Sequence, residues 1–106
     1  MSVTDWTTEE QHIARSAFEA GKKNSIKTLI STLIAESTNL ETPESIWRFH
    51  DFLSTERFQY EGRSEFDMNN ILFTLAEMLK QDHITLEDLT GLDDKKMHKI
   101  KAMSMF

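Results

Sequence analysis

Residues that break helices are scarce in this chain, which has three glycines and one proline among 106 residues. Good helix formers such as glutamate, lysine, leucine and methionine are frequent instead. No stretch alternates apolar and polar residues for more than a few positions, as a half-buried strand would. The sequence therefore predicts an all-α fold, in one domain or one domain with an arm.

Several classes of protein are excluded by composition. The chain has no cysteine, so disulfides, thiolate metal sites and cysteine nucleophiles are absent. Its longest apolar run is three residues, 71–73, so no membrane insertion is expected. The acidic start lacks an apolar signal region, and we expect a cytoplasmic protein. The net charge of −6 opposes nucleic acid as a partner.

The first helix is expected over about 8–37. Thr7-Thr8-Glu9-Glu10 forms a capping box, with Trp6 placed to pack on the first turns. The second half carries an amphipathic stripe at i, i+3, i+4, i+7 and i+8: Ile26, Leu29, Ile30, Leu33 and Ile34. The weak stretch 21–25 leaves a kink or a break open, and we favour a continuous helix.

A second helix is expected over about 43–61. Thr42 is placed to cap it, and Pro43 occupies the first helical position, where a missing amide costs nothing. We expect the helix to end near Tyr60, with Gly62 as a left-handed terminator. Two long N-terminal helices, within residues 1–62, therefore come first in the chain.

Three shorter helices follow, over about 65–80, 86–90 and 94–103. Ser64 to Asp67 supply the first capping pattern, Thr85 caps the second helix, and Asp93 or Asp94 caps the third. Gly91 stops the middle helix. Together they predict a small helical head at residues 63–106. Four lysines follow Asp94, where we expect them to complement the dipole of the last helix: Lys95, Lys96, Lys99 and Lys101.

No constellation for catalysis or cofactor binding is present. The four histidines, His12, His50, His83 and His98, form no metal-binding pair, and there is no phosphate loop or nucleophile elbow. We therefore expect no enzyme activity, no metal and no cofactor. Segment 86–96 resembles half of a helix-hairpin-helix element, but a packing corner is the preferred interpretation. The lysines of 95–101 leave a small nucleic-acid-binding regulator as a lesser alternative.

The second helix is rich in aromatic residues: five of the ten in the chain lie between 47 and 60. They do not share one face, so the helix should be covered on two sides. Ile46, Phe49, Leu53 and Tyr60 form one side, and Phe52 lies apart. The other stripe mixes aromatic rings with polar groups, as interface cores do: Trp47, His50, Asp51, Ser54, Arg57 and Phe58.

Two charges in that stripe suggest a twofold interface. Asp51 and Arg57 lie roughly 9 Å apart along a helix and point about 120° apart, so they pair poorly within one chain. Across an antiparallel twofold centred near Ser54, Asp51 of one copy would approach Arg57 of the other, forming two equivalent salt bridges. This favours a homodimer. The alternative is that Trp47 packs against the first helix and Arg57 is merely solvated.

The same residues carry a family resemblance. The run IWRFHDFLS at 46–54, followed by Arg57 and Gly62, resembles the signature of the cyanobacterial fluorescence recovery protein family. The resemblance continues through 71–80 and ends in 87–101, so that it covers roughly residues 43–103. It implies an all-helical protein with an extended stalk, residues 1–62, through which it is dimeric, and a compact helical head. It implies no enzymatic chemistry.

The resemblance also implies a partner and a function. Members bind the photoactivated orange carotenoid protein through its C-terminal domain and speed its return to the resting form. They also help to detach it from the phycobilisome, which ends non-photochemical quenching and photoprotection. Trp47, His50, Asp51 and Arg57 match the family's dimer-interface patch, and Arg57 matches its key arginine. Phe73 and Lys99 match head positions for partner binding. A homologue with a different protein client is the alternative.

Overall fold

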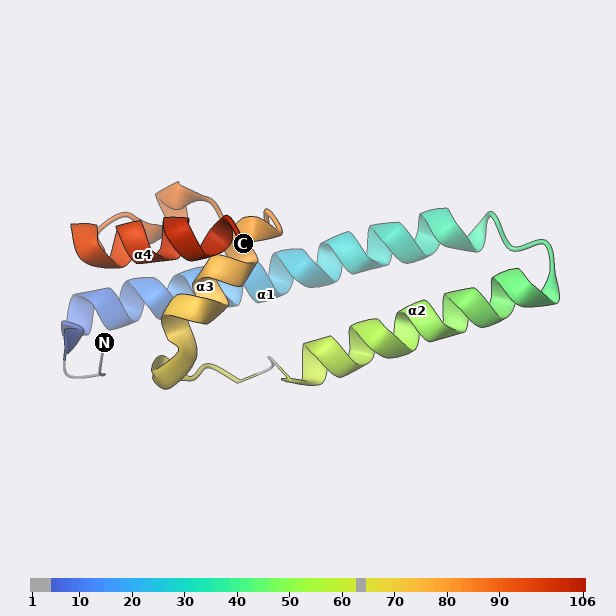
Figure 1. Cartoon of the computed structure of the whole chain (residues 1–106), viewed down its shortest axis with the longest axis horizontal. Helices are drawn as coiled ribbons and strands as arrows, with labels where there is room; N and C mark the ends of the chain where they lie inside the picture. Colours follow the sequence, from blue (N-terminus) through green and yellow to red (C-terminus); the bar gives the residue numbers. More distant parts are fainter. Residues whose placement is uncertain (1–4, 63–64) are drawn as a thin grey trace. The chain divides into compact units, whose positions relative to one another are not determined.

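The computed structural model describes residues 5–62 and 65–106. Within these ranges the chain consists of helices joined by turns, bends and irregular segments, with no strand (Figure 1). The elements, in order, are α1 (Thr8–Ser37), α2 (Pro43–Gly62), the 3₁₀ turn η2 (Met68–Asn70), α3 (Ile71–Lys80), the 3₁₀ turn η3 (Leu86–Leu89) and α4 (Asp94–Ser104). The predicted all-α class with two long N-terminal helices is confirmed. None of the helices in the described ranges is long and apolar enough to cross a bilayer.

The start of α1 is the capping box predicted from the sequence. The Glu10 amide donates to Thr7 Oγ1 at 3.0 Å, and the Thr7 amide donates to Glu10 Oε1 at 3.1 Å. The helix is continuous through Gly21, as favoured. Gly21 is needed for space, because a Cβ there would lie 2.5 Å from Met78 Sδ and 3.0 Å from Ile84 Cγ2. The glycine at position 21 therefore reflects close packing against α1 and not a break in the helix.

The start of α2 is also as predicted. The Ser45 amide donates to Thr42 Oγ1 at 3.1 Å, and the Thr42 amide donates to Ser45 Oγ at 3.0 Å. The predicted terminator is wrong, because Gly62 is the last residue of α2 itself. Among the described glycines only Gly91 has a positive φ. Gly62 therefore belongs to the helix and is not a left-handed residue that ends it.

The third helix starts later than predicted. Ser64 lies outside the described residues, and α3 begins at Ile71. Asp67 instead caps the turn η2, accepting from the Asn69 amide at 2.9 Å and from Asn70 Nδ2 at 3.3 Å. Short polar side chains of this kind compete with helical hydrogen bonding by bonding locally. The regular helix consequently begins only after Asn70.

A left-handed residue ends α3. Asp82 has φ +60°, and the His83 amide donates to the Met78 carbonyl at 2.9 Å. With the Asp82 amide on the Leu79 carbonyl at 3.1 Å, this is a Schellman motif. Asn24 of α1 then donates from Nδ2 to the His83 carbonyl at 2.8 Å. The turn is therefore held to α1 by a hydrogen bond between residues 59 positions apart.

The last two elements keep their predicted caps. The short helix is the 3₁₀ turn η3, where the Thr85 amide donates to Asp88 Oδ2 at 2.8 Å. Gly91 follows with φ +107°, and a Cβ there would lie 2.5 Å from Ile13 Cδ1. Of the two candidate caps for α4, Asp93 is the one used, accepting from the Lys96 amide at 2.9 Å.

The chain forms two compact units. The head unit comprises Phe66–Phe106 and the described residues up to Asn24, and the hairpin unit comprises the described residues of Ser25–Glu65. The predicted head at 63–106 therefore extends to the N-terminal half of α1. The physical reason is burial, because α1 contributes Ala14, Ala17 and Phe18 to the interior.

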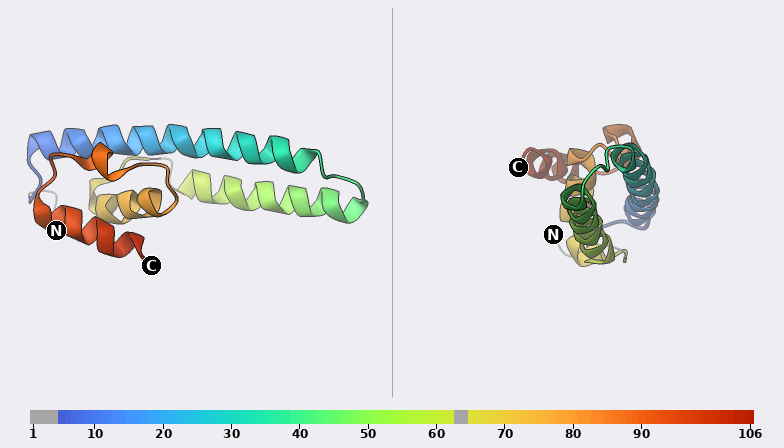
Figure 2. Two further views of the ribbon diagram at one scale, coloured as in Figure 1. Left: turned by 90° about the horizontal axis from the view of Figure 1, so that it is seen from above. Right: turned by 90° about the vertical axis from the view of Figure 1, so that its right-hand side faces the viewer.

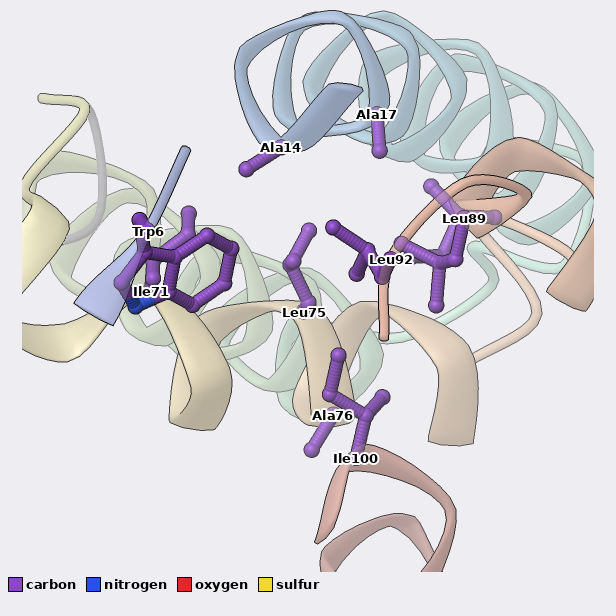
Figure 3. Packing of buried hydrophobic residues seen from close by; sticks show 10 residues of the cluster. Trp6, Ala14, Ala17, Ile71, Leu75, Ala76, Leu89, Leu92 and Ile100 are labelled. Carbon is purple, nitrogen blue, oxygen red and sulfur yellow. The ribbon is translucent and has the colours of Figure 1, made fainter. Parts of the chain in front are cut away.

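The head unit contains the hydrophobic core. Small residues let its helices approach closely: in Figure 3, Ala76 of α3 lies against Ile100 of α4, and Ala14 and Ala17 of α1 project into the same interior. Figure 2 shows α4 beside α3, in agreement with their contacts. The buried apolar cluster consists of Trp6, Ala14, Ala17, Ile71, Leu75, Ala76, Ile84, Leu89, Leu92 and Ile100.

Candidate interaction surface

The hairpin unit has no interior of its own. No described residue between Ser25 and Glu65 is fully buried, and α2 has no buried residue over its 20 positions. Most of the exposed large apolar side chains of the described chain lie here: Ile30, Ile34, Leu40, Ile46, Trp47, Leu53, Phe58 and Tyr60. Exposed apolar side chains in such number on one element pair are typical of an interaction surface.

The structure places all six predicted interface residues of α2 on the outside. Trp47 is 63% exposed and Phe58 is 80% exposed. His50, Asp51, Ser54 and Arg57 are exposed as well. The interpretation in which Trp47 packs inside against the first helix is therefore wrong for the single chain.

The side of α2 that is covered differs from the prediction. The half-buried positions are Ser45, Phe49, Phe52 and Glu56, at i, i+4, i+7 and i+11. Phe52, expected to lie apart, belongs to this face. Ile46, Leu53 and Tyr60, expected beside Phe49, are exposed. Of the predicted side only Phe49 lies on the covered face, so helical spacing alone did not indicate which face of α2 the chain covers.

The charges of α2 have local partners in the single chain. Arg57 Nε donates to Glu61 Oε1 at 2.7 Å, one turn further along the helix. His50 Nδ1 lies 3.3 Å from Asp51 Oδ1. Asp51 and Arg57 make no ion pair with each other in the described chain, as their angular separation predicts. Both local pairs are solvent-exposed, so each contributes little to stability and is easily exchanged.

The two predicted contact residues of the head lie on neighbouring helices. Phe73 of α3 is 60% exposed, although α3 is the most apolar helix. Lys99 of α4 is also exposed, and α3 packs against α4. The head unit therefore presents an aromatic ring and a cation on its outer surface.

A buried ionic cluster, which the sequence analysis did not predict, joins the two ends of the head unit. Lys96 is only 1% exposed. Its ammonium donates to Asp93 Oδ2 at 3.0 Å, to Glu10 Oε1 at 3.2 Å and to the Asp5 carbonyl at 2.9 Å. The nitrogen also lies 5.0 Å from the centroid of the Trp6 ring. Lys96 therefore acts as an interior anchor and is withdrawn from the predicted basic patch of 95–101.

The sequence did contain a signal for this burial. Within α4, Lys96 precedes Ile100 and Met103 at i, i+4 and i+7, on the face that packs into the core. Its position also corrects the dipole argument, because Lys95 and Lys96 lie in the first turn of α4 and only Lys101 lies in the last.

Each member of the cluster stabilises the charge of the others. The pKa of Glu10 is lowered, chiefly by the Thr7 amide, with the Asp93 amide and Lys96 adding to this against the effect of burial. Hydrogen bonds from the Lys96 amide and ammonium lower the pKa of Asp93. Burial lowers the pKa of Lys96, but its bonds to Asp93 and Glu10 outweigh that effect and raise it. The arrangement is structural, and no three acidic or histidine side chains of the described ranges could hold a metal ion.

Comparison with known proteins identifies relatives of this fold. Residues 6–104 match the sequence profile of the family described as photoprotection regulator fluorescence recovery protein. The fluorescence recovery protein of Synechocystis sp. is 29% identical over 99 residues, covering 93% of this chain and 91% of that protein.

Solved structures of such proteins are similar as well. The structure of the Fremyella diplosiphon fluorescence recovery protein superposes with a TM-score of 0.82 at 32% identity, covering 95% of this chain and 99% of that one. The structure of the Synechocystis fluorescence recovery protein superposes with a TM-score of 0.81 at 29% identity, again covering 95% of this chain and 99% of that one.

Proposed function

The chain belongs to the fluorescence recovery protein family of photoprotection regulators, and on this premise we propose that it acts on the photoactivated orange carotenoid protein. It binds the C-terminal domain of that protein in the cytoplasm and accelerates its return to the resting form. This ends non-photochemical quenching at the phycobilisome. The chain needs no cofactor for this role, because the pigment stays with the partner. It speeds a slow relaxation by binding the transition state more tightly than the starting state.

The observation that supports an interaction role best is the hairpin unit without buried residues. A helix with Trp47 and Phe58 largely exposed leaves apolar surface in water, which association would remove. We propose that α2 pairs with α2 of a second copy. The same surface then serves the homodimer and, once that dimer opens, the partner.

Charge exchange gives this dimer its register. In the single chain Arg57 bonds Glu61, and Asp51 lies beside His50. An antiparallel twofold near Ser54 would bring Asp51 of one copy to Arg57 of the other, twice per dimer. Because the local pairs are exposed, exchanging them costs little. The salt bridges across the dimer specify alignment more than affinity.

The head supplies the second part of the partner surface. Phe73 is exposed on α3 and Lys99 on the adjoining α4, and neither is needed for the core. We propose that these two residues, with Arg57, contact the carotenoid protein. Phe73 offers apolar surface that association would remove from water, and Lys99 offers a charge that can complement an acidic group of the partner.

A dark-recovery measurement tests the function. Orange carotenoid protein is photoactivated, this protein is added at equimolar concentration, and the loss of red absorbance is followed in the cold. We expect clear acceleration that Arg57→Leu abolishes and that Arg48→Leu, an exposed arginine on the same helix, retains. No acceleration by a well-folded protein would reject this client and point to a homologue with another one.

The dimer is tested separately by light scattering coupled to size exclusion. We expect twice the chain mass for the parent protein, and a single-chain mass for Trp47→Glu, which places a charge in the apolar stripe. Glu44→Gln, near the start of the same helix, is the matched control and should remain dimeric. A monomeric parent protein at micromolar concentration would contradict the α2 interface.

A further inference from the structure

A polar hollow lies in the head unit, beside the Asp67 cap of η2. Its volume is about 360 Å³, and it is formed between the first two turns of α1 and the segment leading into α3. Its lining includes Thr8, His12, Arg15, Phe66, Asp67 and Met68. None of these belongs to the proposed dimer stripe or to the pair Phe73 and Lys99.

Arg15 is held in this hollow by an aromatic ring. The guanidinium carbon of Arg15 lies 4.4 Å from the centroid of Phe66. Phe66 is in turn fixed edge-on against Phe18, with ring centroids 5.4 Å apart. Stacking of this kind orients a guanidinium while leaving its N–H groups available along its edge. The Arg15 side chain has no hydrogen bond or ion pair within residues 5–62 and 65–106.

The lining contains one carboxylate among the described residues, that of Asp67. Its Oδ1 accepts from the Asn69 amide at 2.9 Å, and its Oδ2 accepts from Asn70 Nδ2 at 3.3 Å. Asp67 makes no ion pair with Arg15 within the described residues. The positive charge of Arg15 therefore has no ion-pair partner in the lining of its own hollow.

Two further polar side chains point the same way along α1. Thr8, His12 and Arg15 are spaced at i, i+4 and i+7, so they share one helix face. All three line the hollow. The side chains of Thr8 and His12, like that of Arg15, have no hydrogen-bond partner in the part of the chain that the structure describes. The site thus offers hydrogen-bond donors around a fixed cation, with the apolar side chains of Phe66 and Met68 beside them.

We propose that this hollow docks an acidic side chain of a partner protein, with its carboxylate on Arg15 and a neighbouring apolar side chain against Phe66 and Met68. A carboxylate is planar and matches the fork of guanidinium donors. The apolar floor favours a peptide segment over a free anion, because a bare anion gains nothing from it. The proposal is independent of the identity of the carotenoid partner and of the dimer.

The test is a titration followed by the amide NMR signals of the whole protein. The probe is the peptide acetyl-Glu-Leu-Glu-amide, compared with acetyl-Gln-Leu-Gln-amide. We expect shift changes centred on His12, Arg15 and Phe66, with a dissociation constant of about 1 mM, as for a few screened contacts. Raising the salt concentration should weaken binding of the acidic peptide. The glutamine peptide should bind at least about fivefold more weakly than the acidic one.

Variants assign the effect to the stacked cation. Arg15→Gln should weaken peptide binding about fivefold, and Arg48→Gln, an exposed arginine on α2, should leave it unchanged. Phe66→Leu keeps an apolar side chain but removes the ring, and should weaken binding as well. Arg15→Gln should leave the melting temperature unchanged, since Arg15 is exposed. Phe66→Leu should lower it, since Phe66 packs against the core, so its peptide binding is compared well below that temperature.

Three results would overturn the proposal. The first is an absence of shift changes around the hollow at 10 mM peptide, a concentration about tenfold above the expected dissociation constant. The second is equal binding of the parent protein and both hollow variants. The third is binding of acetate or inorganic phosphate as tight as that of the acidic peptide, which would indicate a small-anion site with no role for the apolar floor.

Discussion

The ammonium of Lys96 lies 3.2 Å from Glu10 Oε1, an ion pair between residues 86 positions apart with both side chains buried. It ties the first turn of α1 to the first turn of α4, and Asp93 and the Asp5 carbonyl complete the coordination of the cation. No buried side-chain nitrogen or oxygen of the described residues is left without a partner. The head unit therefore closes on a fully satisfied polar cluster at the edge of its apolar core.

Removing the cation of this cluster should destabilise the fold strongly. Lys96→Met leaves the buried Glu10 carboxylate with its amide hydrogen bonds but without its cation, and breaking one side of a buried pair costs about 3–5 kcal/mol. Urea unfolding followed by circular dichroism, at one protein concentration, measures the change. Lys95→Met, at an exposed neighbouring position, is the control and should change stability by less than about 0.5 kcal/mol. Equal effects at both positions would contradict the assigned anchor.

Stability should fall in acid because of the same cluster. The pKa values of Glu10 and Asp93 lie below their ordinary values of 4.5 and 3.8, so their contribution is present above those values. It is lost as the pH falls through the lowered pKa values of the folded state. The raised pKa of Lys96 acts oppositely, and its contribution is full below 10.5 and lost as the pH rises through the raised value. The melting temperature, measured across pH, should fall at both the acid and the alkaline end. Glu10→Gln should make the fall at the acid end shallower. An unchanged fall at the acid end would argue against this role of Glu10.

Gly21 should resist even the smallest side chain. A Cβ would meet Met78 Sδ at 2.5 Å and Ile84 Cγ2 at 3.0 Å, and overpacking of this kind costs about 1–3 kcal/mol. The middle of that range, about 2 kcal/mol, exceeds the gain in helix propensity of about 1 kcal/mol, so Gly21→Ala should lower stability. Gly62→Ala is the control, because nothing lies within 4 Å of a Cβ there and α2 includes it. In denaturant unfolding, the free energy of unfolding should fall for Gly21→Ala and rise for Gly62→Ala.

The turn after α3 should be improved by glycine. Asp82 adopts φ +60°, a conformation that costs a residue with a side chain about 1 kcal/mol, and its charge lies at the negative end of the helix dipole. Asp82→Gly should raise the unfolding free energy by about 1 kcal/mol. Gln81→Gly, with φ −90° at the adjoining position, should not raise it. A loss of stability in Asp82→Gly would mean that the carboxylate has a role of its own.

Removing the Glu61 partner of Arg57 should distinguish its salt bridge within the chain from its proposed salt bridge to Asp51 of a second copy. Glu61→Ala removes the exposed bond to Arg57, and such pairs contribute only about 0.3–0.5 kcal/mol. We expect nearly unchanged thermal stability and a dimer at least as tight, measured by sedimentation. A markedly weaker dimer would mean that the Arg57–Glu61 pair, and not Arg57 with Asp51, aligns the interface.

The helix starts could be predicted because they depend on neighbours in sequence. Thr7 with Glu10, and Thr42 with Ser45, satisfy amides within one turn, so short-range chemistry is enough. The start of α3 was predicted too early, because Asp67 bonds locally in a turn that delays the helix. Gly62 was misassigned because a glycine near a helix end is compatible with both ending and continuing it.

The exposed stripe of α2 could also be predicted as a set, since helical spacing groups Trp47 with Phe58. The face of α2 that is covered by the rest of the chain could not be predicted. Phe52 and Leu53 are both strongly apolar, and only the course of the chain makes Phe52 half-buried and leaves Leu53 exposed. The burial of Lys96 was missed for a related reason. A lysine at the first turn of a helix is normally solvated, and its partners Glu10 and Asp5 lie more than 80 residues away.

The sequence by itself thus determined the fold class, the helix caps and the aromatic stripe, because each depends on composition or on residues within a turn of one another. The tertiary structure decided what lies inside. It joined the N-terminal half of α1 to the head, buried Lys96 beside Glu10, and set the guanidinium of Arg15 over Phe66. These pairings join residues far apart in sequence, and only packing of the whole chain, in which many weak contacts act together, can select them.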